Sequence, residues 1–268
     1  MALDITGKVG WWSGSVNVAP SVDADAQAFI TAANITDTTQ KSAINTLVTQ
    51  LKTYGIWTKM KALYPFVGGT AAQHRFNLKD PRAVDAAFYL SFYGGGTHSA
   101  TGYQPNGNSY ADTKLKPNDM AQNSAHMSIY LRTNVDNGVD MGSNTINRFW
   151  ISANLGSGVR PLGLLNVVPF AVTGPNLDTR AFLLASRTDS TTNKLFRNSS
   201  LIYNETAASS TPDAYNIYLG AFNVNNGGSQ YSLRQQSFAS IGDGLTDAEA
   251  TAFYTAVQAY QTTLGRQV

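Results

Sequence analysis

Hydrophobic positions follow helical spacing in two segments before residue 56. The stretch DTTQKSAINTLVTQLKTYG, residues 37–55, spaces its apolar residues by three and four: Ile44, Leu47, Val48 and Leu51. Asp37 can cap its start, and Gln40 stands three residues later, which is the spacing of a capping box. We predict a helix here that ends at Gly55, and a shorter helix over DADAQAFITAANI just before it.

After Val67 the pattern changes to short apolar or alternating runs separated by Gly, Asn, Asp and Pro. These runs predict strands within residues 86–95, 126–134, 147–155, 164–174, 180–189, 194–204, 215–224 and 231–241. The run KLFRNSSLIYN predicts a hairpin with its turn at Asn198-Ser199-Ser200. No helical pattern separates the runs, so we expect antiparallel pairing rather than βαβ units.

The C-terminal stretch predicts one well-capped helix. Thr246 and Glu249 have capping-box spacing, Leu245 can form a hydrophobic staple, and Gly265 can end the helix. Its apolar face is formed by Phe253, Val257, Tyr260 and Leu264. We expect this helix to cover an open end or edge of the β-structure, where unpaired strand groups would otherwise invite aggregation.

These patterns divide the chain into three parts. Residues 1–20 are an arm, residues 21–65 a helical segment packed on the sandwich, and residues 66–268 an antiparallel two-sheet sandwich ending in a helix. The arm contains GWWSGSVNVAP, in which Trp11 and Trp12 are the only large apolar feature. The two tryptophans either anchor the arm to its own domain or dock on a neighbouring subunit or a ligand.

Composition narrows the functional classes. Charged residues make up only 13% of the 268 residues. The net charge is +2 and the sequence has no Lys/Arg cluster, and these two features argue against nucleic-acid binding. No apolar run is long enough for a membrane span, and the first residues lack the pattern of a signal peptide. With no cysteine, we expect folding in a host cytoplasm, without disulfides or thiolate metal sites.

The order of the last elements resembles a known family. A hairpin, NKLFRNSSLIYNET, is followed by AYNIYLGAFNVNNGGSQYS and then by SFASIGDGLTDAEATAFYTAVQAYQTTLG. This order is similar to concanavalin-A-like (laminin-G-like) jelly-roll modules. The upstream LVTQLKTYGIWTKMKALYPFVGGTAAQHRFNLKDP resembles lectin-like modules of bacteriophage tail-fibre and virion proteins. The resemblance covers about residues 23–268 and implies a jelly-roll sandwich that binds glycans or proteins, or that serves in assembly.

The sequence contains little that predicts catalysis. Related jelly-roll glycosidases carry two glutamates and an aspartate on one strand, whereas this chain has only Glu205 and Glu249. The three histidines, His74, His98 and His126, lack the spacing of a zinc site. We therefore expect no enzyme and no cofactor. Asp136 and Asp140 in TNVDNGVDMGSN form either a structural turn or a Ca²⁺ site that lacks the EF-hand order.

Two loops are candidate recognition surfaces, residues 94–112 and 223–232. Both are rich in Asn, Gly, Ser and Tyr, a mixture that combines rigid aromatic faces with adaptable amides. They are candidates for glycan contact, for subunit contact, or for plain solvated loops. The candidate ligand-binding residues are His98, Tyr103, Asn106, Asn108, Tyr110, Asn223, Asn225, Asn226, Gln230 and Tyr231.

These observations together predict a non-enzymatic bacteriophage virion protein, a fibre, spike or decoration subunit whose lectin-like module binds a host surface glycan. One alternative is a purely structural capsid or tail subunit, and another is a glycan-processing enzyme. The expected partners are other virion proteins and further copies of the chain, for example in a trimer. Several copies of the chain in one particle would then bind together, so that weak individual contacts add up to strong overall binding.

Overall fold

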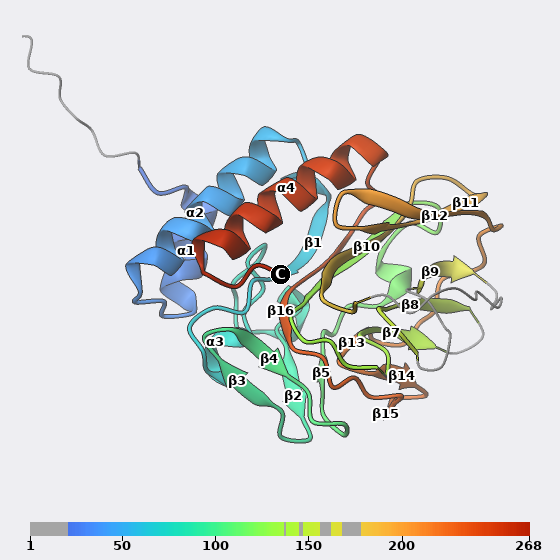
Figure 1. The fold of residues 1–268 in the computed structure, drawn as a ribbon, viewed down its shortest axis with the longest axis horizontal. Helices are drawn as coiled ribbons and strands as arrows, with labels where there is room; N and C mark the ends of the chain where they lie inside the picture. The colour runs from blue at the N-terminus through green and yellow to red at the C-terminus, as the bar shows by residue number, and fades with distance from the viewer. Residues whose placement is uncertain (1–20, 137, 145–146, 156–161, 168–177) are drawn as a thin grey trace, which may run out of the picture.

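The computed structural model of the chain describes residues 21–136, 138–144, 147–155, 162–167 and 178–268 (Figure 1). The predicted arm, with Trp11 and Trp12, lies outside the described residues, as does the end of the strand run 164–174. The described residues form three layers: a group of helices, a first β-sheet and a second β-sheet. The predicted mainly-β, two-sheet jelly-roll-like sandwich is therefore confirmed.

The first sheet has eight strands, seven of them in the order β12-β11-β10-β6-β16-β4-β3, with β1 also paired to β16. Its strands are β1 (Met60–Tyr64), β3 (Thr97–Ser99), β4 (Gly102–Gln104), β6 (Ala125–Leu131), β10 (Ala181–Arg187), β11 (Thr192–Arg197), β12 (Ser200–Thr206) and β16 (Gln236–Gly242). Every residue of β6, β10 and β16 is buried, because these central strands are covered on both faces.

The second sheet also has eight strands. Six follow the order β15-β14-β7-β13-β5-β2, while β8 pairs with β7 and β9. The strands are β2 (Ser91–Tyr93), β5 (Tyr110–Asp112), β7 (Met141–Asn144), β8 (Arg148–Ser152), β9 (Leu162–Val167), β13 (Tyr218–Leu219), β14 (Phe222–Val224) and β15 (Gly227–Ser229). The described pairs of this sheet are antiparallel except β14 with β7, which is parallel.

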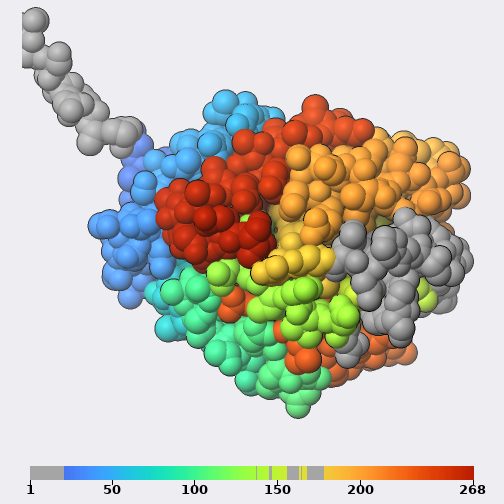
Figure 2. Space-filling model, viewed as in Figure 1, coloured from blue at the N-terminus to red at the C-terminus, as the bar shows by residue number. Residues whose placement is uncertain are grey.

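The longer helices are α1 (Ala24–Ala32), α2 (Thr38–Thr53) and α4 (Asp247–Thr263), and a single helical turn, α3 (Ala71–His74), follows β1. Short 3₁₀ turns occur at η1 (Trp57–Lys59), η2 (Asp85–Ala87) and η3 (Pro117–Asp119). In Figures 1 and 2, α4 lies beside α2 on one side of the molecule. Strand β1 falls inside the stretch 21–65 that we expected as a helical segment, and it pairs with β16 instead.

The starts of α2 and α4 are capped by side chains, as the sequence predicted. Thr246 Oγ1 accepts from the Glu249 backbone amide at 3.3 Å, and Glu249 Oε2 accepts from the Thr246 amide at 2.8 Å, which confirms the capping box. Asp37 Oδ1 accepts from the Gln40 amide at 2.8 Å. The Gln40 side chain does not complete a box there, because its Oε1 accepts from the Gly68 amide at 2.8 Å.

The C-terminal helix covers a face of the first sheet, whereas the sequence led us to expect an end or an edge. Phe253 of α4 packs against Phe182 of β10 and Phe238 of β16, with ring centroids 5.6 and 5.9 Å apart. Large aromatic side chains thus alternate outward on the central strands, so this face needs an apolar cover. Two cores result, one between the helices and the first sheet and one between the two sheets.

Candidate functional site

The structure brings part of each predicted recognition loop together on the second sheet, whereas β3 and β4, in the middle of loop 94–112, belong to the first sheet. Strand β2 immediately precedes loop 94–112 and β5 ends it, while the β14–β15 hairpin begins at Phe222 and otherwise lies within loop 223–232. Both pairs belong to one sheet, with β13 and β7 between them. They lie together along the lower edge of the molecule in Figure 1. Two segments more than 100 residues apart therefore form one surface.

Four tyrosines gather on this surface, and we call them the tyrosine row: Tyr93, Tyr110, Tyr218 and Tyr231. Tyr110 is stacked on Tyr93 with ring centroids 5.1 Å apart and on Tyr218 with centroids 4.3 Å apart. The Tyr231 ring lies 6.5 Å from that of Tyr110. Tyr93 stands at the open end of the stack and is 46% exposed, whereas Tyr218 is 4% exposed.

Strand pairing explains why the rings share one face. Tyr93 is paired directly with Tyr110, and Tyr218 is paired with Asp112, two residues further along β5. Alternate side chains of a strand point to opposite faces, so the intervening Ala111 points into the core between the sheets. The stack covers both faces of the Tyr110 ring, and the surface therefore offers ring edges, hydroxyls and the outer face of Tyr93.

Asn106 shapes the loop beside Tyr93. Its Nδ2 donates to the carbonyl of Gly94 at 2.9 Å, and its Oδ1 accepts from the Asn108 amide at 3.2 Å. Gly94 has a φ of +77°, and a Cβ atom there would lie 2.4 Å from the Asn108 carbonyl oxygen, so only glycine fits. Asn106 and Asn108 are exposed beside the row.

The β14–β15 hairpin forms the other side of the row. Asn225 and Asn226 occupy its two-residue turn with φ of 50° and 67°, the backbone of a type I′ turn, and both are exposed. Asn223 is buried and holds the turn, because its Oδ1 accepts from the Asn226 amide at 2.8 Å. Gly228 lets the hairpin approach closely: a Cβ there would lie 2.7 Å from the Tyr231 hydroxyl.

Gln230 follows the hairpin and is exposed. Its φ is 48°, and its backbone carbonyl accepts from the Val139 amide at 2.7 Å, so its backbone is fixed. The exposed or half-exposed predicted residues that the structure brings to this surface are Asn106, Asn108, Tyr110, Asn225, Asn226, Gln230 and Tyr231.

Sequence reasoning missed the charged part of the surface. Asp112 lies on the same face as Tyr110, and its Oδ2 accepts from Lys114 Nζ at 2.9 Å. Asn216 Nδ2 donates to both Asp112 oxygens, at 3.0 and 3.1 Å. Burial first, and then the Asp112 carboxylate, raise the pKa of Tyr218, and burial raises the pKa of Tyr110 as well. These tyrosine hydroxyls therefore stay protonated at neutral pH.

His98 and Tyr103 belong to a different environment. The His98 ring stacks on Tyr103 with centroids 5.1 Å apart, and its Nδ1 lies 3.0 Å from Nδ1 of His74. Tyr103 is fully buried, and burial raises its pKa to about 12. Burial also lowers the pKa of His74 to about 3 and that of His98 to about 4. His74 and Tyr103 are buried, His98 is half-buried beside them, and none of the three joins the tyrosine row.

The Asp136–Asp140 segment is organised around an arginine. Asp140 is fully buried, and its Oδ1 accepts from Arg234 Nε at 2.9 Å. The same guanidinium donates to the carbonyls of Val135, Gly138 and Asn154 at 3.0, 2.8 and 2.9 Å. Arg234 thus supplies the positive charge at the centre of these oxygens. Among the described residues there is no cluster of three or more His, Cys, Asp or Glu suited to a metal ion.

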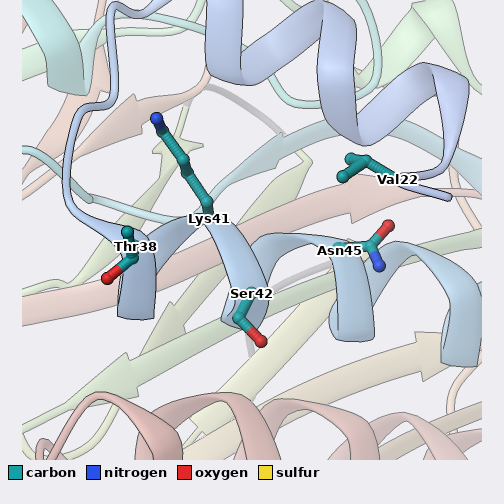
Figure 3. Close-up of a pocket in the computed structure, with 5 residues that line it drawn as sticks. All are labelled: Val22, Thr38, Lys41, Ser42 and Asn45. Carbon is teal, nitrogen blue, oxygen red and sulfur yellow. The ribbon is translucent and has the colours of Figure 1, made fainter. Parts of the chain in front are cut away.

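A shallow pocket of about 300 Å³ lies among the helices, away from the tyrosine row (Figure 3). It is lined by Val22, Thr38, Lys41, Ser42 and Asn45. Figure 3 shows Lys41, Ser42 and Asn45 along α2, with Val22 opposite them. Its lining offers one charged side chain, Lys41, and three uncharged polar ones.

Comparison with known proteins identifies the fold but no sequence family. No protein-family model matches the chain, and no curated protein matches its sequence. Trypanosoma rangeli sialidase in complex with sialic acid superposes with a TM-score of 0.52 at 11% identity, over 74% of this chain and 33% of the sialidase chain. A mutant of that sialidase displaying trans-sialidase activity gives 0.51 at 8% identity, over 82% and 39%.

Domain 4 of AbnA, an extracellular GH43 arabinanase from Geobacillus stearothermophilus in complex with arabinotriose, matches over 73% of this chain and 98% of that one. Its TM-score is 0.47 at 15% identity. This chain spans well under half the length of the sialidases it resembles. The neighbours with TM-scores above 0.5 are described as sialidases, and at 11% and 8% identity the likeness establishes the fold alone.

These neighbours correct the expectation that the chain is not an enzyme. We expected no enzyme because no strand carries a pair of glutamates. The fold is nevertheless shared with proteins described as sialidases. A glutamate count drawn from one family of jelly-roll glycosidases does not exclude catalysis on this sandwich. Within the described ranges, no helix is both long and apolar enough to cross a membrane.

Proposed function

We propose that this chain recognises glycans through the tyrosine row and works as a subunit of a bacteriophage particle, in a fibre, spike or decoration. The observation that carries the glycan part is the convergence of two amide-rich loops on one row of tyrosines. The support for a virion role is the resemblance of residues 23–268 to lectin-like modules of phage virion proteins.

The chemistry of the surface suits sugars. A sugar ring has an apolar face and a rim of hydroxyls, and the outer face of Tyr93 can stack against the first while the amides bind the second. The rings hold one another in place, and Asn106 and Asn223 fix the two flanking turns. A preformed surface loses little conformational entropy on binding, which favours recognition by few contacts.

The test is binding of polysaccharide by two matched tyrosine variants. Tyr93→Ala removes the exposed end of the stack, and Tyr54→Ala removes a tyrosine of similar exposure, 38%, that follows helix α2. We expect Y93A to weaken binding about tenfold or more, and Y54A to leave it unchanged. Equal binding by wild type and Y93A would refute a role for the row.

The virion role has a separate test in the arm. Residues 1–20 carry Trp11 and Trp12, and we expect their deletion to abolish assembly while the sandwich still folds. Light scattering measures the assembly and circular dichroism the fold. Unchanged assembly after the deletion would contradict a subunit contact through the tryptophans.

A second candidate function is glycan processing, which the likeness to the sialidase structures favours. Asp112 is the carboxylate that the structure places on the face of the row. Turnover at this surface would therefore depend on Asp112 as its acid or base. Release of reducing ends from a bound polysaccharide by wild type, and its loss in Asp112→Asn, would establish this function. Binding without turnover would leave recognition as the function of the row.

A further inference from the structure

Arg148 is a basic residue on the outer face of the second sheet. Its neighbours on β8, Phe149 and Ile151, belong to the core between the sheets, so Arg148 and Trp150 point to the outer face. Arg148 is half-buried, and its guanidinium carbon lies 5.8 Å from the centre of the Trp150 ring. It forms no ion pair with any described residue, and its buried Nε has no hydrogen-bond partner among them.

A guanidinium in this environment is incompletely stabilised. A charged group that leaves water needs an opposite charge or hydrogen bonds, and the described residues give Arg148 neither. Burial lowers the pKa of Arg148, which is the direction expected for a cation that loses water without gaining a partner. The Trp150 ring compensates in part through a cation–π contact. The N–H donors of Arg148 can therefore bind an anion that comes from outside the chain.

Two other basic residues of the second sheet and its loops are already neutralised. Lys114 forms an ion pair with Asp112 at 2.9 Å, and these two side chains are only 18% and 10% exposed. Arg234 forms an ion pair with Asp140 at 2.9 Å, and both are fully buried. Of these three basic side chains, Arg148 alone has no acidic partner among the described residues.

Arg148 and the tyrosine row belong to one sheet face. Tyr218 of the row pairs with Gly142 on β7, and Gly142 pairs with Trp150 on β8. Gly142 places no side chain between the two rings. Two strand spacings across the sheet, and the two residues from Trp150 to Arg148, put the backbones of Tyr218 and Arg148 about 12 Å apart.

The β14–β15 hairpin contacts both parts of this face. The carbonyl of Asn226 accepts from the Tyr218 hydroxyl at 3.5 Å, and the Phe222 ring packs edge-on against Trp150 with centroids 5.2 Å apart. The exposed amides of the hairpin turn therefore stand beside the row and beside the Trp150 cluster. A glycan chain that extends from the row past this turn reaches the guanidinium of Arg148.

We infer that Arg148 binds a carboxylate of a glycan chain held on the tyrosine row, so that the surface prefers acidic chains to uncharged ones. The inference rests on the proposed function and names its ligand class. A planar guanidinium presents two parallel N–H donors that match the two oxygens of a carboxylate. The row supplies stacking and amide contacts that do not depend on charge, and Arg148 adds the preference for acidic sugars.

The experiment compares polygalacturonate with its methyl ester, the same chain without the charge, by titration of the native protein at low salt. We expect wild type to bind the acid form about tenfold more tightly than the ester, because a charge-assisted hydrogen bond is lost with the ester. Arg148→Gln should bring this ratio towards one. Arg82→Gln makes the same change in an exposed arginine that is paired with Asp80, outside the row, and should keep the wild-type ratio.

A second variant keeps the test decisive if Arg148→Gln does not fold. Arg148→Lys keeps the charge but loses the fork, so its ratio should lie between one and the wild-type value. Equal binding of acid and ester by wild type, or an unchanged ratio in either variant, would overturn the inference.

Galactan, an uncharged chain, measures the row by itself and separates the two proposals. Its binding should be weakened by Tyr93→Ala and unaffected by Arg148→Gln. Where Y93A weakens galactan binding but the acid-to-ester ratio does not depend on Arg148, the inference fails and the proposed function stands. If no polymer binds, or if Y93A binds galactan as wild type does, the proposed function fails and this inference fails with it.

Discussion

At the residue scale, buried arginines join segments that are far apart in the sequence. Arg266 is 1% exposed and donates to the carbonyls of Phe66, Pro65 and Ser237 at 2.8, 3.2 and 3.2 Å. Arg234 makes an equivalent set of contacts around Asp140. Each guanidinium satisfies several buried carbonyls at once, which a shorter or uncharged side chain could not do.

The Arg266 contacts predict a large loss of stability in Arg266→Leu. The substitution removes the donor of the Phe66 carbonyl and of Gln261 Oε1, whereas Tyr260 and Gln261 still donate to the Pro65 and Ser237 carbonyls. Each buried acceptor without a donor costs about 1–3 kcal/mol, so we expect the free energy of unfolding to fall by about 3 kcal/mol. Arg82→Leu is the control, because the Arg82 side chain is 66% exposed and should change stability by less than about 1 kcal/mol. Urea unfolding measures both, and similar losses in the two variants would contradict this account.

The histidines predict a stability that decreases in mild acid. Burial lowers the pKa of His74 to about 3 and the pKa of His98 and His126 to about 4, below the value of about 6.5 in an unfolded chain. Between pH 6.5 and pH 4 the unfolded state therefore binds more protons than the folded state. The free energy of unfolding should be highest above pH 6.5 and fall as the pH decreases through this window.

A fully buried imidazole such as His126 should account for about 2 kcal/mol of this loss at pH 5, and the half-buried His98 for less. Carboxylates with lowered pKa, such as Asp80, contribute mainly at still lower pH. Urea unfolding at pH 7.5 and pH 5 measures the difference. A stability that stays constant between the two would show that the histidines are protonated in the folded protein.

The sequence alone predicted some residues of the tyrosine row and missed others. Tyr110 and Tyr231 were predicted because they lie in loops of unusual composition. Tyr93 and Tyr218 were missed because they stand on strands whose register decides whether a side chain points inward or outward. Asp112 was missed for the same reason. No local pattern records that β5 pairs with both β2 and β13.

At the element scale, features formed by residues close in the sequence could be predicted, and features that depend on distant residues could not. The caps of α2 and α4 and the turn of the β11–β12 hairpin depend on residues close in sequence, and the structure confirms them. Strands β3, β4 and β5 have only three residues each and carry no alternation that could be recognised. The position of α4 depends on aromatic residues of β6, β10 and β16, which its own sequence does not show.

The capping box of α4 gives a prediction at this scale. Thr246→Ala removes the acceptor for the Glu249 amide and should lower the free energy of unfolding by about 1 kcal/mol. Thr251→Ala, at an exposed position within the same helix, is the matched control and should raise stability slightly, by about 0.5 kcal/mol, because alanine favours the helix more than threonine does. Thermal unfolding of the two variants measures the difference, and equal midpoints would count against the cap.

At the scale of the whole molecule, the helices and the tyrosine row lie on opposite sides of the sandwich. Helices α1, α2 and α4 cover the first sheet, whereas the row stands on the outer face of the second. One side of the module is therefore closed by apolar packing, and the other presents hydroxyls and amides to solvent. This division leaves the row accessible to a ligand from solvent.

The most direct test is a crystal structure of the protein bound to a galactan oligosaccharide. The account predicts a sugar ring against the exposed face of Tyr93, with hydrogen bonds to the loop of Asn106 and Asn108 or to the turn of Asn225 and Asn226. An oligosaccharide bound instead in the helical pocket beside Lys41, with the tyrosine row empty, would contradict it.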